Sequence, residues 1–247
     1  MWFVCRLIWR VILILDLIAF TLFLSALSLF HHRRFNSWFQ RIFQSWCHTF
    51  IRALGVKLRA HQHYRTTLPK QFIVIANHPS IFEDVGMPAL FDARFLSKEE
   101  LKDWWIIGRI AKAVGILFVK REDKSSRKAA REALAAAIQA GDSVGLFPEG
   151  GCFTRRIYTP FTRGAFDLAF TTGVPIVPVF LHYPAQESFE WTDQTAPRKI
   201  IELFCASNLV ADYHIFEPIN PQDFSDAEHL RTYTEQQYLR WQERFLD

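Results

Sequence analysis

The chain has 247 residues, half of which are hydrophobic, and its 29 basic and 25 acidic side chains give a formal net charge of +4. This length fits one sizeable domain, and the apolar content is enough to bury a core with some left over. The four cysteines have neither Cys-x-x-Cys nor Cys/His ligand spacing, which indicates a reduced compartment and argues against a metal site.

The basic charge is concentrated at the N-terminal end. Residues 1–70 contain ten Lys and Arg residues and one acid, Asp16, whereas the rest of the chain has more acids than bases. A basic segment can meet nucleic acid or anionic lipid. Because the basic residues coincide with the longest apolar runs, few could line a solvated groove for a phosphate backbone. We therefore expect membrane lipids, and no nucleic acid, as partners.

The first predicted element is a membrane-embedded helix over residues 11–30, VILILDLIAFTLFLSALSLF. The run has the ~20 apolar residues that a helix needs to cross a bilayer core, and it is long for a signal peptide. Arginines flank it on both sides, and their bias favours a body on the cytoplasmic side of the inner or plasma membrane. Asp16, the single charge within the run, leaves open a helix that dips into one leaflet.

The next segment predicts an amphipathic helix that lies in the membrane interface. Its apolar and aromatic residues recur with helical spacing at Phe35, Trp38, Phe39, Ile42, Phe43, Trp46, Phe50, Ile51 and Leu54. Packing of this stripe on a domain core is the alternative. We predict an N-terminal membrane-associated helical segment over residues 1–64 and one further domain over residues 65–247.

From residue 65 onward, strand and helix patterns alternate. Strands are predicted at 71–78, 93–98, 116–121, 143–150 and 175–183, and helices at 81–90, 99–113, 125–139, 164–172 and from about 226. Residues 199–207 and 213–219 are expected to extend and cover the sheet. Because the strands are apolar almost throughout, the predicted fold class is α/β, with a mostly parallel central sheet flanked by helices.

Polar residues close three of these strands, at Asn77-His78, Lys120-Arg121 and Pro148-Glu149-Gly150. Sites in such sheets lie beyond the carboxyl ends of the strands, so we expect these groups at one edge. Arginine suits phosphate, and the Gly-rich turn after residue 149 can face an anion, although each arginine could be an ordinary surface charge. The predicted substrate-binding residues are Asn77, Ser80, Lys120, Arg121, Glu149, Gly150, Gly151 and Arg155.

His78 is the predicted general base. A neutral imidazole can take a proton from a substrate alcohol if a carboxylate holds the ring and its other nitrogen keeps its hydrogen. If Ser80 caps the following helix, Glu83 lies in the first turn and can turn back toward His78, whereas Asp84 points to a different side. We predict His78 and Glu83 as catalytic residues, with Asp84 as the alternative partner. The alternative interpretation of the same sequence pattern is a capped helix next to an exposed histidine that has no catalytic role.

Four sequence blocks resemble those of the lysophosphatidate acyltransferases, which belong to the glycerolipid acyltransferase superfamily, and the resemblance covers residues 74 to about 180. Asn77 to Glu83 is similar to Asn-His-x-x-x-x-Asp, Gly115 to Arg121 to Gly-x-x-Phe-x-x-Arg, Phe147 to Gly150 to Phe-Pro-Glu-Gly, and Val174 to Val179 to the final proline-rich strand. Two residues depart from the family pattern: Glu83 stands in place of Asp, and Gly151 in place of Thr or Ser.

The resemblance implies a membrane-bound enzyme of phospholipid biosynthesis that moves a fatty acyl chain from acyl-CoA or acyl carrier protein to lysophosphatidate, giving phosphatidate. His78 would take the proton from the lysolipid hydroxyl, with Arg121 and Glu149 holding the phosphorylated acceptor. No metal or organic cofactor is implied beyond the donor thioester, and residues 65–247 would form the catalytic domain. Glu83 and Gly151 leave open another lysophospholipid or a lipid-linked amino acid as acceptor, and an inactive lipid-binding membrane protein is a further alternative.

Overall fold

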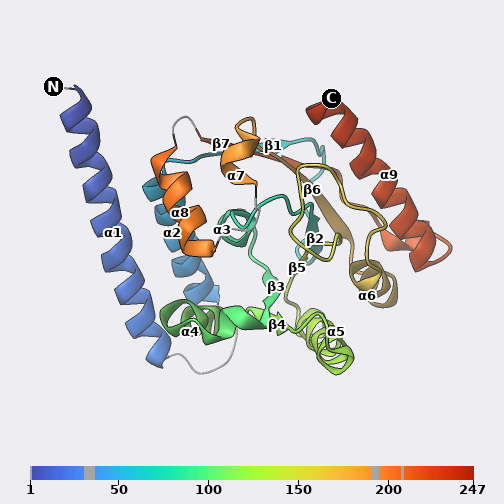
Figure 1. The fold of residues 1–247 in the computed structure, drawn as a ribbon. Helices are drawn as coiled ribbons and strands as arrows, with labels where there is room; N and C mark the ends of the chain where they lie inside the picture. Colours follow the sequence, from blue (N-terminus) through green and yellow to red (C-terminus); the bar gives the residue numbers. More distant parts are fainter. Residues whose placement is uncertain (1, 31–36, 191–194, 207–208) are drawn as a thin grey trace.

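The predicted alternation of strands and helices builds one sheet with helices on both faces (Figure 1). The computed structural model describes residues 2–30, 37–190, 195–206 and 209–247, and within these residues seven strands lie in the order β1-β7-β6-β2-β5-β3-β4. They are β1 (Lys57–Gln62), β2 (Ile73–Ala76), β3 (Arg94–Lys98), β4 (Leu117–Val119), β5 (Val144–Leu146), β6 (Ile176–His182) and β7 (Val210–Ile215). Neighbouring strands are parallel except β6 with β7, so the predicted mostly parallel sheet is confirmed.

Two layers of helices enclose separate hydrophobic cores on the two faces of the sheet. The helices are α1 (Trp2–Phe30), α2 (Ser37–Leu54), α3 (Glu83–Leu90), α4 (Trp105–Val114), α5 (Lys124–Gln139), α6 (Gly164–Thr172), α7 (Gln186–Phe189), α8 (Ala196–Cys205) and α9 (Ala227–Leu246), with short 3-10 helices η1 (Glu99–Asp103) and η2 (Pro221–Asp223). Helices α2, α3 and α4 cover one face, and α5, α6 and α9 cover the other (Figure 1).

Two elements differ from the sequence prediction. The pattern does not predict β1, because this strand lies at the edge of the sheet and alternates polar residues such as Lys57, Arg59 and His61. Its pairing with β7 makes residues 57–62 part of the sheet. Residues 199–205 belong to α8, which packs beside α2 and α7, so they do not extend the sheet, and their amphipathic pattern suits such a helix.

The aromatic stripe of α2 packs on the domain core, so its predicted orientation toward lipid is wrong. Phe39, Phe43, Trp46, Ile51 and Leu54 are buried in the core that α2 shares with α3, α4 and the sheet. Helical periodicity shows that a helix has an apolar face, but it does not show what covers that face. Phe35, at the start of the predicted stripe, lies outside the described residues.

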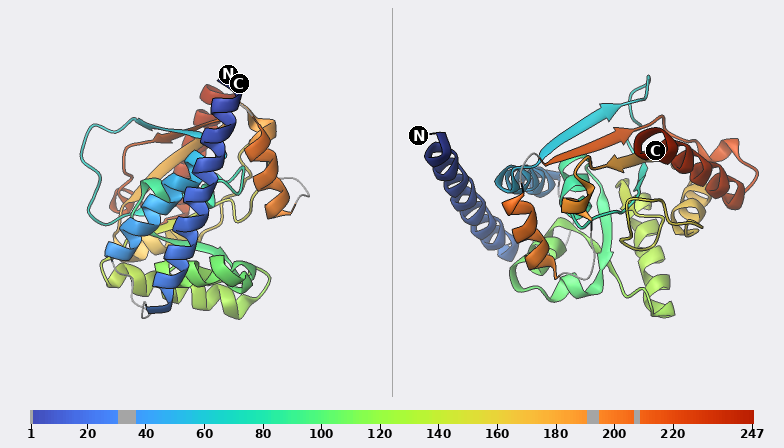
Figure 2. Two further views of the ribbon diagram at one scale, coloured as in Figure 1. Left: turned by 90° about the vertical axis from the view of Figure 1, so that its left-hand side faces the viewer. Right: turned by 45° about the horizontal axis from the view of Figure 1, so that its top comes forward.

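Helix α1 carries the exposed apolar surface instead. It lies alongside α2 at the opposite end of the molecule from α9 (Figure 2), and the Trp46 indole N–H donates to the Thr21 hydroxyl at 2.8 Å. Its outer face exposes Ile8, Trp9, Val11, Ile12, Leu15, Ile18, Leu22, Phe23 and Leu29. Among the described helices, this one is long and apolar enough over Ile8–Leu29 to cross a membrane.

Close packing of α3 against β7 leads to a first prediction. A β-carbon at Gly86 would overlap the hydroxyl end of Tyr213, whose side chain is fully buried. Because neither element can yield freely, Gly86→Ala is expected to lower the free energy of unfolding by about 1–3 kcal/mol. Denaturant unfolding measures the change. The matched variant Gly164→Ala, where nothing lies within 4 Å of the added carbon, should not be destabilised.

Candidate active site

His78 and Glu83 meet in the turn that follows β2. Nδ1 of His78 lies 2.8 Å from Oε2 of Glu83, and the same oxygen accepts the backbone N–H of Ser80 at 2.9 Å. The other Glu83 oxygen accepts a hydrogen bond from the Tyr183 hydroxyl. With Nδ1 donating its proton to the carboxylate, Nε2 keeps the lone pair that a base requires. Glu83, rather than Asp84, is therefore the carboxylate that orients the ring.

Both members of this pair are shielded from water. His78 is 6% exposed and Glu83 is 0% exposed, and the Phe147 ring stacks on the imidazole with centroids 4.1 Å apart. Burial lowers the pKa of His78 to about 4, which keeps the ring neutral at physiological pH. Burial also raises the pKa of Glu83, while hydrogen bonds from Tyr183 and the Ser80 N–H oppose this by stabilising the carboxylate.

Asn77 and Ser80 shape the turn that carries His78. The Asn77 side chain bridges β2 and β6, donating to the Leu181 carbonyl at 3.0 Å and accepting the Leu181 N–H at 2.7 Å. The Ser80 hydroxyl accepts the N–H of Phe82 at 3.2 Å, whereas α3 begins without a side-chain cap, contrary to the predicted Ser80 cap. Both side chains are engaged within the protein.

Glu149 contacts the backbone of His78. Its two oxygens accept the backbone N–H groups of His78 at 2.7 Å and of Tyr158 at 2.8 Å, so the carboxylate ties the turn after β2 to the loop after β5. Burial raises the pKa of Glu149 to about 7, and the two N–H donors act in the opposite direction. In this arrangement both carboxylate oxygens hold backbone, rather than a bound acceptor.

The loop after Glu149 requires glycine at positions 150 and 151. Gly150 adopts a left-handed backbone conformation (φ 78°), and a β-carbon at Gly151 would come within 2.7 Å of the Phe153 ring. That ring stacks on Tyr158 with centroids 4.1 Å apart. The space that a Thr or Ser side chain would need at position 151 is therefore taken by Phe153.

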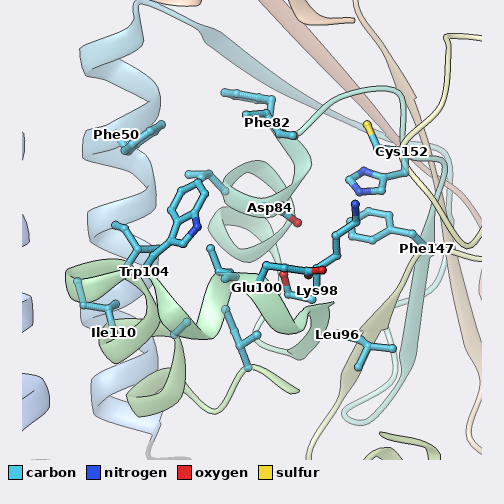
Figure 3. Close-up of a pocket in the computed structure, with 18 of the residues that line it drawn as sticks. Phe50, Phe82, Asp84, Leu96, Lys98, Glu100, Trp104, Ile110, Phe147 and Cys152 are labelled. Atoms are coloured by element: carbon cyan, nitrogen blue, oxygen red, sulfur yellow. The ribbon is translucent and has the colours of Figure 1, made fainter. Parts of the chain in front are cut away.

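A pocket of about 310 Å³ opens beside His78 (Figure 3). One end is lined by apolar side chains of α2 and of the η1 to α4 region, among them Phe43, Trp46, Phe50, Leu54, Trp104 and Ile110. The other end is polar, and its lining includes His78, Asp84, Lys98, Glu100, Arg121 and Cys152. Burial raises the pKa of the Cys152 thiol, so it stays protonated at neutral pH. The pocket thus joins a long apolar wall to a charged end that contains the histidine.

Of the basic residues near the predicted site, Arg121 lies at the pocket, whereas Arg155 and its neighbour Arg156 lie away from it. Arg121 lines the pocket, whereas the exposed Lys120 does not. Arg155 and Arg156 lie at the end of α9, where Arg155 contacts the Leu246 carbonyl at 3.5 Å and Arg156 pairs with Asp247 at 2.6 Å. Closeness in sequence to the Gly-rich turn does not bring these two side chains to the pocket, because the loop carries them toward the C-terminal helix.

The sequence prediction of the site lacks several residues that line the pocket or contact the histidine pair, among them Lys98, Glu100 and Tyr183. Lys98 and Tyr183 each close a predicted strand, at 93–98 and at 175–183. The rule that selected His78 and Arg121, polar groups at the carboxyl ends of strands, would have found both. Glu100 lies in η1, and no strand end marks it.

Comparison with known proteins identifies the family. Residues 57–182, more than half of the chain, match the family model described as Acyltransferase. This chain belongs to the acyltransferase family. The 1-acyl-sn-glycerol-3-phosphate acyltransferase of Neisseria gonorrhoeae is 28% identical over 115 residues, which are 47% of this chain and 45% of that protein. The chain thus spans about half the length of the first curated relatives that it matches.

Two further comparisons cover more of this acyltransferase. The lyso-ornithine lipid O-acyltransferase of Rhodobacter capsulatus is 27% identical over 207 residues, which are 79% of this chain and 72% of that protein. The crystal structure of the lysophosphatidate acyltransferase PlsC from Thermotoga maritima superposes with a TM-score of 0.65 at 20% identity and covers 95% of this chain and 97% of that one. The second likeness establishes a shared fold.

The low pKa of His78 predicts that this residue adds no step to the pH profile of the acyltransferase between about pH 5 and 8. Because burial lowers this pKa to about 4, the base stays neutral on raising the pH from about 5 to 8, and its titration should leave kcat/KM unchanged there. A free histidine would titrate near pH 6.5. The measurement is kcat/KM against pH with a lysophosphodiester acceptor, whose phosphate does not titrate in this range. Protonation of Glu149, whose pKa is about 7, is separated by repeating the profile with Glu149→Gln. A loss of activity centred near pH 6.5 that persists in this variant would contradict the assigned environment of His78.

Proposed function

We propose that this acyltransferase moves a fatty acyl chain from a thioester, acyl-CoA or acyl carrier protein, to the free hydroxyl of a phosphate-bearing lysolipid. Lysophosphatidate, giving phosphatidate in phospholipid biosynthesis, is the acceptor predicted from the sequence. The observation that carries the proposal is the buried His78–Glu83 pair at the charged end of an otherwise apolar pocket. A base, an anion-binding end and an apolar wall are what this reaction needs.

In the proposed reaction His78 Nε2 accepts the hydroxyl proton while the hydroxyl oxygen attacks the thioester carbonyl. A new C–O bond forms, the C–S bond breaks, and the thiolate leaves and takes the proton from the imidazolium. Glu83 holds the Nδ1 proton throughout and stabilises the positive ring. Lys98 and Arg121 supply positive charge near the base for an anionic acceptor group. This sequence of steps uses no metal or organic cofactor beyond the thioester.

We further propose that α1 attaches the protein to the membrane, with the catalytic body on the cytoplasmic side. Its exposed apolar face and its length over Ile8–Leu29 support the attachment. The arginines that follow the apolar run in the sequence support the cytoplasmic side. Asp16 is exposed on the same helix, which is compatible with either a spanning helix or one embedded in a single leaflet.

A second acceptor class is favoured by a specific observation. The match to the lyso-ornithine lipid enzyme extends over 79% of this chain, and Gly151 offers no hydroxyl to an acceptor. These points support a lysolipid whose head group carries an amino group.

The proposed reaction can be tested through the thiol that it releases. Purified full-length protein in neutral detergent micelles is given palmitoyl-CoA or palmitoyl carrier protein, with and without lysophosphatidate or an amino-bearing lysolipid. We expect thiol release that depends on a lysolipid. Absence of lysolipid-dependent release with both donors and all acceptors would refute the proposal.

A further inference from the structure

Four charged side chains line the polar end of the pocket: the cations of Lys98 and Arg121 and the carboxylates of Asp84 and Glu100. They come from four places in the fold, namely α3, the end of β3, η1 and the segment after β4. In Figure 3, Asp84, Lys98 and Glu100 converge on the same side of the cavity, away from the apolar residues Phe50 and Ile110. The formal charges of the four groups cancel.

These charges do not neutralise one another by direct pairing. Among the described residues, no ion pair within 4.0 Å joins any of the four to another charged side chain, and their charged ends make no hydrogen bond to protein. Elsewhere in this part of the chain such pairs form readily, as between Arg94 and Asp142 at 2.6 Å. Asp84, Lys98 and Glu100 are exposed and Arg121 is half-buried, so the four charges are accessible from the pocket. A ligand that supplies both opposite charges can therefore pair with both signs there.

The balance of charge discriminates between acceptor head groups. A phosphate monoester such as that of lysophosphatidate carries about −1.5 to −2 at neutral pH. Two cations would attract it, but two unpaired carboxylates in the same pocket would repel it. A head group with one anion and one ammonium group matches both signs.

We infer that the acceptor site takes a lysolipid with a zwitterionic head group, in which Lys98 and Arg121 face the anion and Asp84 and Glu100 face the ammonium group. This inference rests on the proposed function and narrows its acceptor. Asp84 and Glu100 are then specificity residues, and Asp84 has a role separate from that of Glu83, although the two are adjacent in sequence. Lysophosphatidate becomes the poorer of the two acceptor classes.

The test compares two acceptors that share one oleoyl chain, lysophosphatidylethanolamine and lysophosphatidate, in neutral detergent micelles with purified full-length protein and a palmitoyl thioester. The zwitterionic lipid should have the higher kcat/KM by about tenfold, as expected when one opposing charge is relieved. Asp84→Asn and Glu100→Gln should each shift the ratio of the two kcat/KM values toward lysophosphatidate by about fivefold or more.

Matched controls lie on the same 3-10 helix. Glu99→Gln and Asp103→Asn remove the same kind of charge from η1 at positions that do not line the pocket, and they should leave the acceptor ratio unchanged. A preference for lysophosphatidate that Asp84→Asn and Glu100→Gln do not alter would overturn the inference while leaving acyl transfer intact. An equal shift in the control variants would overturn it as well. Turnover of neither lipid with palmitoyl-CoA or with palmitoyl carrier protein would refute the proposed function itself.

Discussion

Replacement of His78 by Ala is expected to lower kcat for acyl transfer by about 10²- to 10⁴-fold, the range that a general base contributes. No other imidazole lines the pocket among the described residues, so nothing in that part of the chain replaces the lost Nε2. The measurement is lysolipid-dependent thiol release by purified protein at saturating donor. His48→Ala, an exposed histidine on α2, should retain the activity of the unmodified chain.

Loss of folding must be separated from loss of the base. Removing the ring leaves the buried Glu83 carboxylate without one donor, so His78→Ala is also expected to cost about 1–3 kcal/mol of unfolding free energy. His78→Gln supplies an amide N–H in place of Nδ1–H but no base. Both variants should show the same loss of kcat, about 10²- to 10⁴-fold, and the Gln variant should unfold at a higher denaturant concentration than the Ala variant. A folded His78→Gln protein with normal kcat would contradict the assigned role.

Glu83→Gln is expected to have the second largest effect. The carboxylate accepts hydrogen bonds from three donors, the imidazole Nδ1–H, the Ser80 N–H and the Tyr183 hydroxyl. An amide of the same size turns an N–H toward one of these donors, so the imidazole loses its orientation and its charge compensation. We expect kcat to fall by about 10²- to 10⁴-fold, as for other carboxylates that orient a catalytic histidine, with little change in KM.

Glu83 is proposed to act on the reaction through His78, so the experiment must distinguish this orienting role from a role in packing alone. Glu83→Asp restores a carboxylate, although one methylene shorter, and should recover part of the lost kcat, whereas a residue needed only for packing would be rescued equally by Gln. Equal activity of the Asp and Gln variants would show that the charge at position 83 does not matter. Thermal unfolding of both variants serves as the stability control.

The sequence predicts the central sheet because its strands are continuous apolar runs. Residues 71–78 and 175–183 contain β2 and β6, which lie side by side at the centre and are buried over almost their whole length. The edge strand β1 escapes the same analysis because its exposed face is polar. Apolar content thus locates strands that helices cover on both faces, and it misses a strand that water reaches.

The site was predictable where contacts are local. His78 and Glu83 are five residues apart, so the turn alone brings them together. Glu149 and Arg155 depend on the course of the loop after β5, which sends one carboxylate to the backbone of His78 and the arginine to the end of α9. The aromatic stripe of α2 has the same limit, since its periodicity is compatible with lipid or with a protein core. Sequence spacing does not encode such long-range choices.

The most direct test of acyl transfer is the stoichiometry of its products. Purified protein is incubated with a palmitoyl thioester labelled with ¹³C in the acyl chain and an unlabelled lysolipid, and thiol, free fatty acid and diacyl lipid are quantified together by mass spectrometry. The His78 mechanism predicts one labelled diacyl lipid for each thiol released, with little labelled free fatty acid. Thiol release accompanied by labelled free fatty acid, without labelled diacyl lipid, would contradict it.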